Sequence, residues 1–340
     1  MYEQFYGFRE RPFDLSPDPK YLVLTAGHQE ALSNLEYAIA SSKGITLLVG
    51  DAGSGKTTVI CAAIARQSAH VHCVHLHNPA LTRDEFVEML ASRFGLSERA
   101  RTSKTALLLE LEVLLRRRRE AGELTLLIVD EAQSLSFELL EELRLLANIE
   151  TNSEKLLPLV IAGQPEITPR LNAPELRQLK QRIALRCELR PLDLTETMSY
   201  IAGRIRAAGG VAAQIFTREA VALIHERSKG LPRTINVLAD NSLVAGFATG
   251  QRPVTSALVR DVCHDFDIQA GTDDDDDPNQ DVQAPESVST SAGSLFERRA
   301  VPPSGPAESP ATAPDLLGSE IAPVEGTGTG FFAKRRYLLG

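Results

Sequence analysis

Apolar residues in this chain occur in short runs that alternate with longer stretches of helical spacing. Four of the runs are rich in Val, Ile and Leu and predict buried strands, at residues 45–49, 71–76, 124–129 and 157–161. Apolar positions repeat at helical spacing near residues 28–42, 56–68, 82–94, 103–119 and 136–150. Strands that alternate with helices are typical of β-α-β units, so we expect an α/β fold with a doubly wound parallel sheet.

Beyond about residue 192 the apolar pattern is helical only. Asp193 followed by Glu196 matches a capping box at the start of a helix. Pro232 suits the first turn of a later helix, where its missing N–H costs nothing. We therefore predict an α/β domain over residues 1–192 and a small all-helical domain over residues 193–268.

The composition changes after residue 269. Residues 271–340 contain 8 of the 19 prolines and 8 of the 23 glycines, with 12 acidic against 5 basic side chains. Five consecutive aspartates stand at positions 273–277. A segment of this kind buries too little apolar surface to offset its chain entropy, so we predict that residues 269–340 form a disordered tail.

The formal net charge of the chain is −9, and the tail supplies −7 of it. The remaining residues are close to neutral, unlike a dedicated nucleic-acid-binding domain. No apolar run approaches the roughly 18 residues that cross a bilayer, and the N-terminus lacks the pattern of a signal peptide. The four cysteines contain no Cys-x-x-Cys pair. These features exclude membrane-spanning and disulfide-rich classes and predict a reduced, cytoplasmic protein.

Residues 50–57 match the phosphate-binding pattern G-x-x-x-x-G-K-[ST], between a predicted strand and a predicted helix. Its glycines let backbone N–H groups surround phosphate oxygens, and the helix start presents the positive end of its dipole. The Lys56 ammonium can contact the β- and γ-phosphates, and the Thr57 hydroxyl can bind Mg²⁺. No Asn-Lys-x-Asp motif for guanine is present. We expect ATP and Mg²⁺ as cofactors, with the nucleotide bound by Gly50, Asp51, Ala52, Gly53, Ser54, Gly55, Lys56, Thr57 and Thr58.

Two acidic residues, Asp130 and Glu131, come directly after the predicted strand at 124–129. A carboxylate at the end of a buried strand suits the hydration shell of Mg²⁺, so we predict Asp130 as a metal ligand beside Thr57. A second carboxylate can act as general base toward the attacking water. We therefore predict Glu131 as a catalytic residue and expect hydrolysis rather than nucleotide binding alone.

The order of these motifs resembles that of AAA+ ATPases, which are P-loop NTPases with a helical lid domain. The chain resembles more narrowly the secretion-pathway ATPases of the ExeA/GspA type and their relatives encoded with exopolysaccharide-export systems. The narrower evidence is the opening sequence Met1-Tyr2-Glu3-Gln4-Phe5-Tyr6-Gly7, the Asp130-Glu131-Ala132-Gln133 box and the sequence Gly163-Gln164-Pro165-Glu166. The resemblance covers about residues 1–268 and implies an ATPase that couples lid motion to a secretion or export partner.

The resemblance also implies roles for single residues. Gln164 matches the sensor-1 position, where a polar side chain contacts the γ-phosphate or the attacking water. Arg233 matches the sensor-2 arginine of the lid. Asn78, at the end of the second predicted strand, matches a position from which a side chain can hold Glu131 away from the water.

A further arginine is implied to act between subunits. Arg182 stands where the family places an arginine finger that reaches the site of a neighbouring subunit, and Arg177 is the competing candidate. The resemblance thus implies a homo-oligomer, as a ring, and a catalytic role for Arg182. Secretion-type relatives typically continue into a membrane-spanning helix, which no apolar run here provides, so we expect coupling through a partner protein.

Two other interpretations remain open or are disfavoured. A DNA-dependent switch that resembles transposition helper ATPases is the alternative function; the charge balance disfavours it, and the arginine run at 116–119 supports it. Histidines cluster around Cys73, at positions 70, 72, 75 and 77. The first two and last two fall on opposite faces of a strand, and no second cysteine or carboxylate completes a set, so we disfavour a metal site there.

Overall fold

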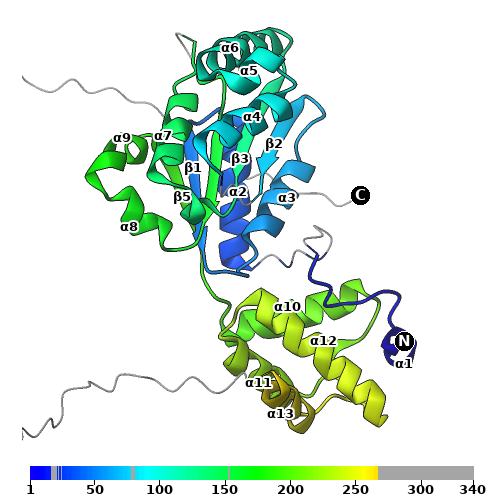
Figure 1. The fold of residues 1–340 in the computed structure, drawn as a ribbon. Helices are drawn as coiled ribbons and strands as arrows, with labels where there is room; N and C mark the ends of the chain where they lie inside the picture. The colour runs from blue at the N-terminus through cyan, green and yellow to red at the C-terminus, as the bar shows by residue number, and fades with distance from the viewer. Residues whose placement is uncertain (17–20, 22, 24, 78–80, 152–153, 267–340) are drawn as a thin grey trace, which may run out of the picture. The chain divides into compact units, whose positions relative to one another are not determined.

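The computed structural model describes residues 1–16, 21, 23, 25–77, 81–151 and 154–266. Within them lies a five-stranded sheet of order β2-β3-β4-β1-β5 in which every pairing is parallel (Figure 1). The strands are β1 Ile45–Gly50, β2 Val71–Leu76, β3 Leu124–Val129, β4 Leu159–Gly163 and β5 Ile183–Leu189. The predicted doubly wound parallel sheet is confirmed.

Helices cover both faces of this sheet (Figure 1). Helices α2 and α3 pack on the face that includes Leu48, and the other helices pack on the face that includes Leu47 and Val49. Neighbouring residues of one strand thus enter opposite cores, as the pleat requires. The helices are α2 Ala26–Ala40, α3 Lys56–Ala65, α4 Arg83–Phe94, α5 Glu98–Thr102, α6 Lys104–Glu120, α7 Phe137–Leu146, α8 Ile167–Leu171 and α9 Arg177–Lys180.

Strand β5 was not predicted, and the limits of several other elements differ from the prediction; two of these limits have a clear cause. Strand β5 was missed because it is an edge strand whose exposed positions carry Arg186 and Glu188, so its sequence contains no apolar run. Strand β4 begins at Leu159 rather than at residue 157, because Pro158 has no N–H to donate to the ladder. Helix α7 ends at Leu146, where i→i+3 turns replace the helical bonds.

A second core is built from helices alone. Helices α10 Leu194–Ala207, α11 Arg218–Ser228, α12 Pro232–Thr249 and α13 Ser256–Asp265 share one cluster of buried apolar side chains. The capping box at Asp193 and Glu196 is confirmed, since each side chain accepts a hydrogen bond from the backbone of the other. No helix in the described residues is both long and apolar enough to cross a bilayer.

The N-terminal residues join this second core instead of the sheet. Helix α1, Tyr2–Tyr6, and the residues after it bury the side chains of Tyr2, Tyr6, Phe8 and Phe13 among α10–α13. The first residues of the region predicted as the α/β domain thus contribute side chains to the helical core. The predicted tail over residues 269–340 lies outside the described residues.

Candidate active site

The loop after β1 forms a tight turn that leads into α3. Gly53 and Gly55 have φ values of 81° and 95°, which residues with a Cβ rarely adopt. A Cβ on Gly53 would also lie 2.6 Å from the Cβ of Arg233. Both the backbone conformation and the close approach of the lid residue require glycine here. The loop therefore presents its backbone amides at the start of a helix, the arrangement that binds phosphate.

Lys56 is buried at the first position of α3, with 4% of its surface exposed. Its ammonium donates hydrogen bonds to the carbonyl oxygens of Gly50 (2.8 Å) and Asp51 (3.0 Å). Burial lowers the pKa of this ammonium, and the nearby carboxylates of Glu131 and Asp130 oppose that effect. A cation held in this way is available to an anionic ligand at the loop.

The two predicted metal ligands lie in contact. The Thr57 hydroxyl donates a hydrogen bond of 2.7 Å to Oδ2 of Asp130, which is buried at the end of β3. A hydroxyl and a carboxylate are hard oxygen donors, and Mg²⁺ binds to one or two such groups while it keeps its waters and takes phosphate oxygens. The donor set therefore fits Mg²⁺ bound together with a nucleotide.

Glu131 is held by two amide side chains. Its Oε2 accepts hydrogen bonds from Nε2 of Gln133 (2.6 Å) and from Nε2 of Gln164 (3.3 Å). Burial opposes the charge of this carboxylate, but these hydrogen bonds and the Lys56 ammonium outweigh burial and lower its pKa. Gln133 also accepts a 3.0 Å hydrogen bond from the backbone N–H of Gln164. It thus links the ends of β3 and β4, a role that the sequence analysis missed although Gln133 belongs to the quoted box.

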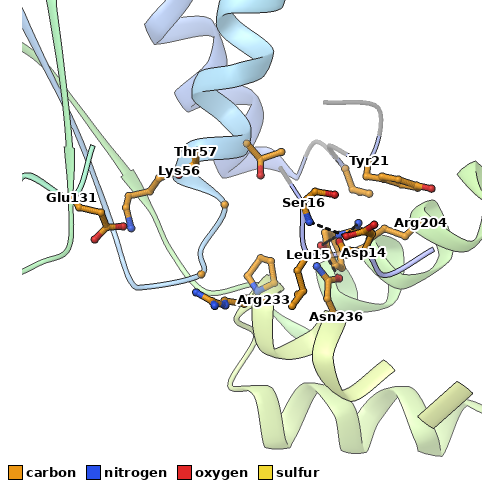
Figure 2. Close-up of a pocket in the computed structure, with 16 residues that line it drawn as sticks. Asp14, Leu15, Ser16, Tyr21, Lys56, Thr57, Glu131, Arg204, Arg233 and Asn236 are labelled. Atoms are coloured by element: carbon orange, nitrogen blue, oxygen red, sulfur yellow. Dashed lines mark hydrogen bonds between the residues drawn. The ribbon is translucent and has the colours of Figure 1, made fainter. Parts of the chain in front are cut away.

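A cavity of about 340 Å³ lies against this loop (Figure 2). Seven predicted residues line it: Gly53, Gly55, Lys56, Thr57 and Thr58 from the loop and the start of α3, and Glu131 and Arg233. The rest of its lining was not foreseen and comes from the N-terminal segment and the lid: Asp14, Leu15, Ser16, Tyr21, Val23, Tyr200, Arg204, Pro232 and Asn236. The phosphate-binding loop, the proposed base and the lid thus face one space.

Arg204 of α10 fixes the N-terminal wall of this cavity. Although it is charged, only 4% of its surface is exposed. Its guanidinium donates hydrogen bonds to the carbonyl oxygens of Pro12 (2.7 Å) and Asp14 (2.9 Å) and to the Tyr200 hydroxyl (2.7 Å). It also lies 4.7 Å from the ring centroid of Tyr21. Sequence patterns could not show this contact because its partners are backbone carbonyls far away in the chain.

His28 of α2 contacts the backbone of the phosphate-binding loop. Its Nε2 lies 3.1 Å from the carbonyl oxygen of Ser54, and its Nδ1 lies 2.8 Å from the Thr25 hydroxyl. Burial lowers the pKa of His28, so the neutral ring donates from Nε2 to the carbonyl and accepts from Thr25. The sequence analysis missed this contact, although helical spacing places His28 on the buried face of α2 with Leu32 and Leu35.

The structure places the predicted residues Arg233 and Arg182 at different distances from the phosphate-binding loop. The backbone N–H of Arg233 donates to the carbonyl oxygen of Gly53 at 3.1 Å, and its side chain is exposed. Arg182 directly precedes β5 and lies beside Ile45, at the start of β1, whereas the phosphate-binding loop follows the end of β1. Its Nε donates a hydrogen bond to Oδ1 of Asn148 at 2.7 Å. It cannot reach the phosphate site of its own chain. Asn78 lies outside the described residues.

The arginine run at 116–119 is largely paired within the chain. Arg116 contacts Glu112, Arg118 contacts Thr125, and Arg119 contacts Glu154. Among these four arginines, only Arg117 has a side chain with no hydrogen bond or ion pair to a described residue. These contacts support an ordinary helix surface and give no support to a nucleic-acid interface.

The histidine cluster differs from our expectation in one respect. A carboxylate does complete the set, because Nε2 of His75 lies 4.0 Å from Oδ2 of Asp130. Burial is the main cause that lowers the pKa of His75 to about 4, so this contact joins a neutral ring to a carboxylate and is not an ion pair. Only the premise that no carboxylate completes the set was wrong, because Asp130, which directly follows the neighbouring strand β3, is far away in the sequence.

Comparison with known proteins finds an AAA domain and a curated relative. Residues 39–171 match the family model described as AAA domain. The chain is 39% identical over 254 residues to general secretion pathway protein A of Aeromonas hydrophila. The match covers 75% of this chain and 46% of that protein. The chain therefore spans about half the length of this relative.

Solved structures share the fold at low identity. The ORC2 protein of Aeropyrum pernix aligns with a TM-score of 0.58 and 19% identity, over 76% of this chain and 72% of that one. Drosophila ORC bound to DNA aligns with a TM-score of 0.55 and 17% identity, over 76% and 66%. At these identities the likeness concerns the fold alone. The sequence matches, the phosphate-binding loop and the acidic pair at the end of β3 show that the chain contains an AAA domain and is related to general secretion pathway protein A.

Proposed function

We propose that this protein binds Mg²⁺-ATP in the cavity at the carboxyl edge of the sheet and hydrolyses it with Glu131 as general base. The observation that carries the proposal is that Lys56, Thr57 and Glu131 line one cavity while Thr57 is hydrogen-bonded to Asp130. These groups supply a phosphate clamp, a metal-binding pair and a base within one site. Mg²⁺, when bound, would neutralise phosphate charge.

Each residue of the site has its own role in the proposed reaction. The backbone amides of residues 50–58 and the Lys56 ammonium bind the phosphates, and Thr57 and Asp130 hold the metal. Glu131 accepts a proton from the attacking water. Gln133 and Gln164 fix the carboxylate by donating to the same oxygen, Oε2, which leaves Oε1 for the water.

The lid senses the nucleotide through the phosphate-binding loop. The hydrogen bond from Arg233 to Gly53 supports direct coupling between α12 and the loop, and the exposed Arg233 side chain is free to approach a phosphate. We propose that movement of the lid acts on a protein partner of a secretion or export system, as the name of the Aeromonas relative suggests. Such an enzyme works in the cytoplasm, where ATP is available.

Dependence on Mg²⁺ and on the loop lysine tests nucleotide use. We expect ATP hydrolysis with Mg²⁺ and none with excess EDTA, and we expect Lys56→Ala to weaken the binding of a fluorescent ATP analogue at least about tenfold, since it removes the buried cation. Lys104→Ala is the matched control, because the ammonium of this lysine also donates a hydrogen bond, but to Glu142 and away from the cavity. Equal affinity in Lys56→Ala and in the control would contradict the proposal.

Arg182 is proposed to act on a neighbouring subunit of a homo-oligomeric ring. Its place at the far edge of the sheet supports action between copies. Arg182→Ala subunits mixed with Lys56→Ala subunits should regain part of the activity, because each supplies what the other lacks. Arg177→Ala in the same mixture distinguishes the two candidates. If activity returns only with Arg177→Ala, Arg177 is the finger, and if neither mixture gains activity, no finger acts in trans.

A further inference from the structure

Two histidines and one aspartate meet where β2 and β3 end. Leu76 pairs with Val129 in the sheet, so the residues that follow them, His77 and Asp130, leave the sheet side by side. His75 and His77 are two residues apart and lie on one face, with ring centroids 3.6 Å apart. One ligand atom from each of His75, His77 and Asp130 can be chosen so that all three lie within 4.8 Å of one another.

One atom of this cluster lacks a hydrogen bond. Nε2 of His75 is buried and has no hydrogen-bond partner among the described residues. A buried polar atom without a partner costs free energy, and most such atoms in proteins have a partner. An ion between the two rings and the carboxylate would supply the missing partner.

The donor set indicates the class of ion. Two imidazole nitrogens and one carboxylate oxygen suit Zn²⁺, Co²⁺ or Ni²⁺, whereas Mg²⁺ prefers oxygen donors alone. Zinc bonds of about 2.0–2.1 Å place tetrahedral ligand atoms about 3.4 Å apart. The ligand atoms, which lie within 4.8 Å of one another, must therefore move closer, and rotations of the side chains would bring them together.

We infer that His75, His77 and Asp130 bind one divalent transition-metal ion, with Zn²⁺ as the model ion and water in the open position. Oδ2 of Asp130, which faces His75, also accepts the hydrogen bond from Thr57. On the proposed function, the same carboxylate serves Mg²⁺. The transition metal therefore competes for Asp130 and inhibits ATP hydrolysis.

Binding of Co²⁺ to the nucleotide-free full chain tests the site without any measurement of ATPase activity. We expect one Co²⁺ per chain with the visible absorption of a nitrogen-bound ion, and displacement of it by Zn²⁺. His77→Ala should lower Co²⁺ affinity at least about tenfold, since even outer-shell partners are worth that much. His77 is exposed, so its loss leaves the fold intact. His72→Ala is the control, because His72 binds Glu123 on the other face.

Inhibition tests the competition. Micromolar Zn²⁺ should inhibit the Mg²⁺-dependent ATPase, excess Mg²⁺ should relieve the inhibition, and His77→Ala should need at least about tenfold more Zn²⁺. Equal Co²⁺ affinity in wild type, His77→Ala and His72→Ala would overturn the site, whatever the ATPase does. If Co²⁺ binds as expected and Zn²⁺ leaves turnover unchanged, the site stands and the competition is overturned. A chain that binds Co²⁺ but hydrolyses no ATP contradicts the proposed function and leaves the metal site supported.

Discussion

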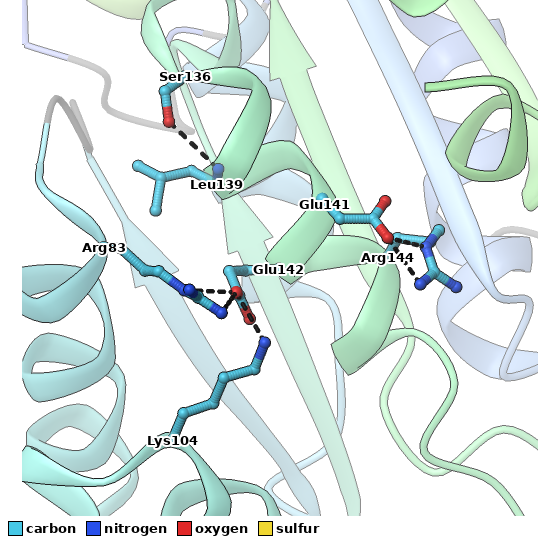
Figure 3. Close-up of polar contacts among 7 residues, drawn as sticks. All are labelled: Arg83, Lys104, Ser136, Leu139, Glu141, Glu142 and Arg144. Carbon is cyan, nitrogen blue, oxygen red and sulfur yellow. Dashed lines mark hydrogen bonds and ion pairs between the residues drawn. The ribbon is translucent and has the colours of Figure 1, made fainter. Parts of the chain in front are cut away.

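Two glutamates of the α/β domain show how differently a carboxylate can be held. Glu131 follows β3, lines the cavity and accepts hydrogen bonds from the amides of Gln133 and Gln164. Glu142 lies on α7, is 8% exposed and is bound by two cations, each at 2.8 Å, Arg83 from α4 and Lys104 from the start of α6 (Figure 3).

These different partners suit Glu131 to a catalytic role and Glu142 to a structural role. Arg83 and Lys104 pair with Glu142 and so join three helices, and Glu142 is not among the residues that line the cavity at the phosphate-binding loop. Amide donors hold Glu131 in place but bring no full charge, so one oxygen remains able to accept a proton. A carboxylate held by amides beside a cavity is thus suited to be a base, and one held by cations is suited to join helices.

The largest expected effect is on the chemical step at Glu131. Glu131→Gln keeps the size and hydrogen-bonding ability of the side chain but removes the base, so steady-state ATP turnover should fall at least about a hundredfold. The affinity for ATP and the melting temperature should change little. Undiminished turnover would contradict the role of Glu131.

Glu142→Gln should lower the stability of the fold and leave ATP turnover unchanged, the reverse of the pattern expected for Glu131→Gln. It leaves Arg83 and Lys104 without their shared anion, so the free energy of unfolding in a urea titration should fall by about 2 kcal/mol. Turnover per folded molecule should stay unchanged. Glu141→Gln is the control, since the Glu141 side chain is 42% exposed and pairs with a single cation, Arg144 of the same helix, so its loss should cost at most about 0.5 kcal/mol. Equal losses in the two variants would show that burial does not matter here.

A smaller effect is expected at Gln133. Gln133→Ala removes one of the two hydrogen bonds to Glu131, and because these bonds lower the pKa of Glu131, its pKa should rise. A base is active when ionised, so the acid limb of the pH profile of kcat should move to higher pH. The loss of kcat at neutral pH should be less than in Glu131→Gln. An acid limb that stays in place would contradict the positioning role.

The sequence was most informative where function depends on adjacent residues. The phosphate-binding loop and the acidic pair are contiguous motifs, and the apolar run before each predicts the strand that positions it. Such local patterns were sufficient to place Lys56, Thr57, Asp130 and Glu131 at one edge of the sheet.

Contacts between distant parts of the chain could not be predicted in this way. The aromatic N-terminal residues enter the helical core, and Arg204 binds backbone carbonyls of Pro12 and Asp14. Backbone acceptors leave no trace in a sequence pattern. His75 and Asp130 come together only because β2 and β3 are neighbours in the sheet, an order that periodicity does not determine.

The rate of hydrolysis of bound ATP in a single turnover, measured side by side for Glu131→Gln and Glu142→Gln, tests the central claim most directly. With enzyme in excess and saturating Mg²⁺, this rate reports the chemical step without product release. The account predicts a fall of at least about a hundredfold in Glu131→Gln and the wild-type rate in Glu142→Gln. A wild-type rate in Glu131→Gln, or an equal fall in both variants, would contradict it.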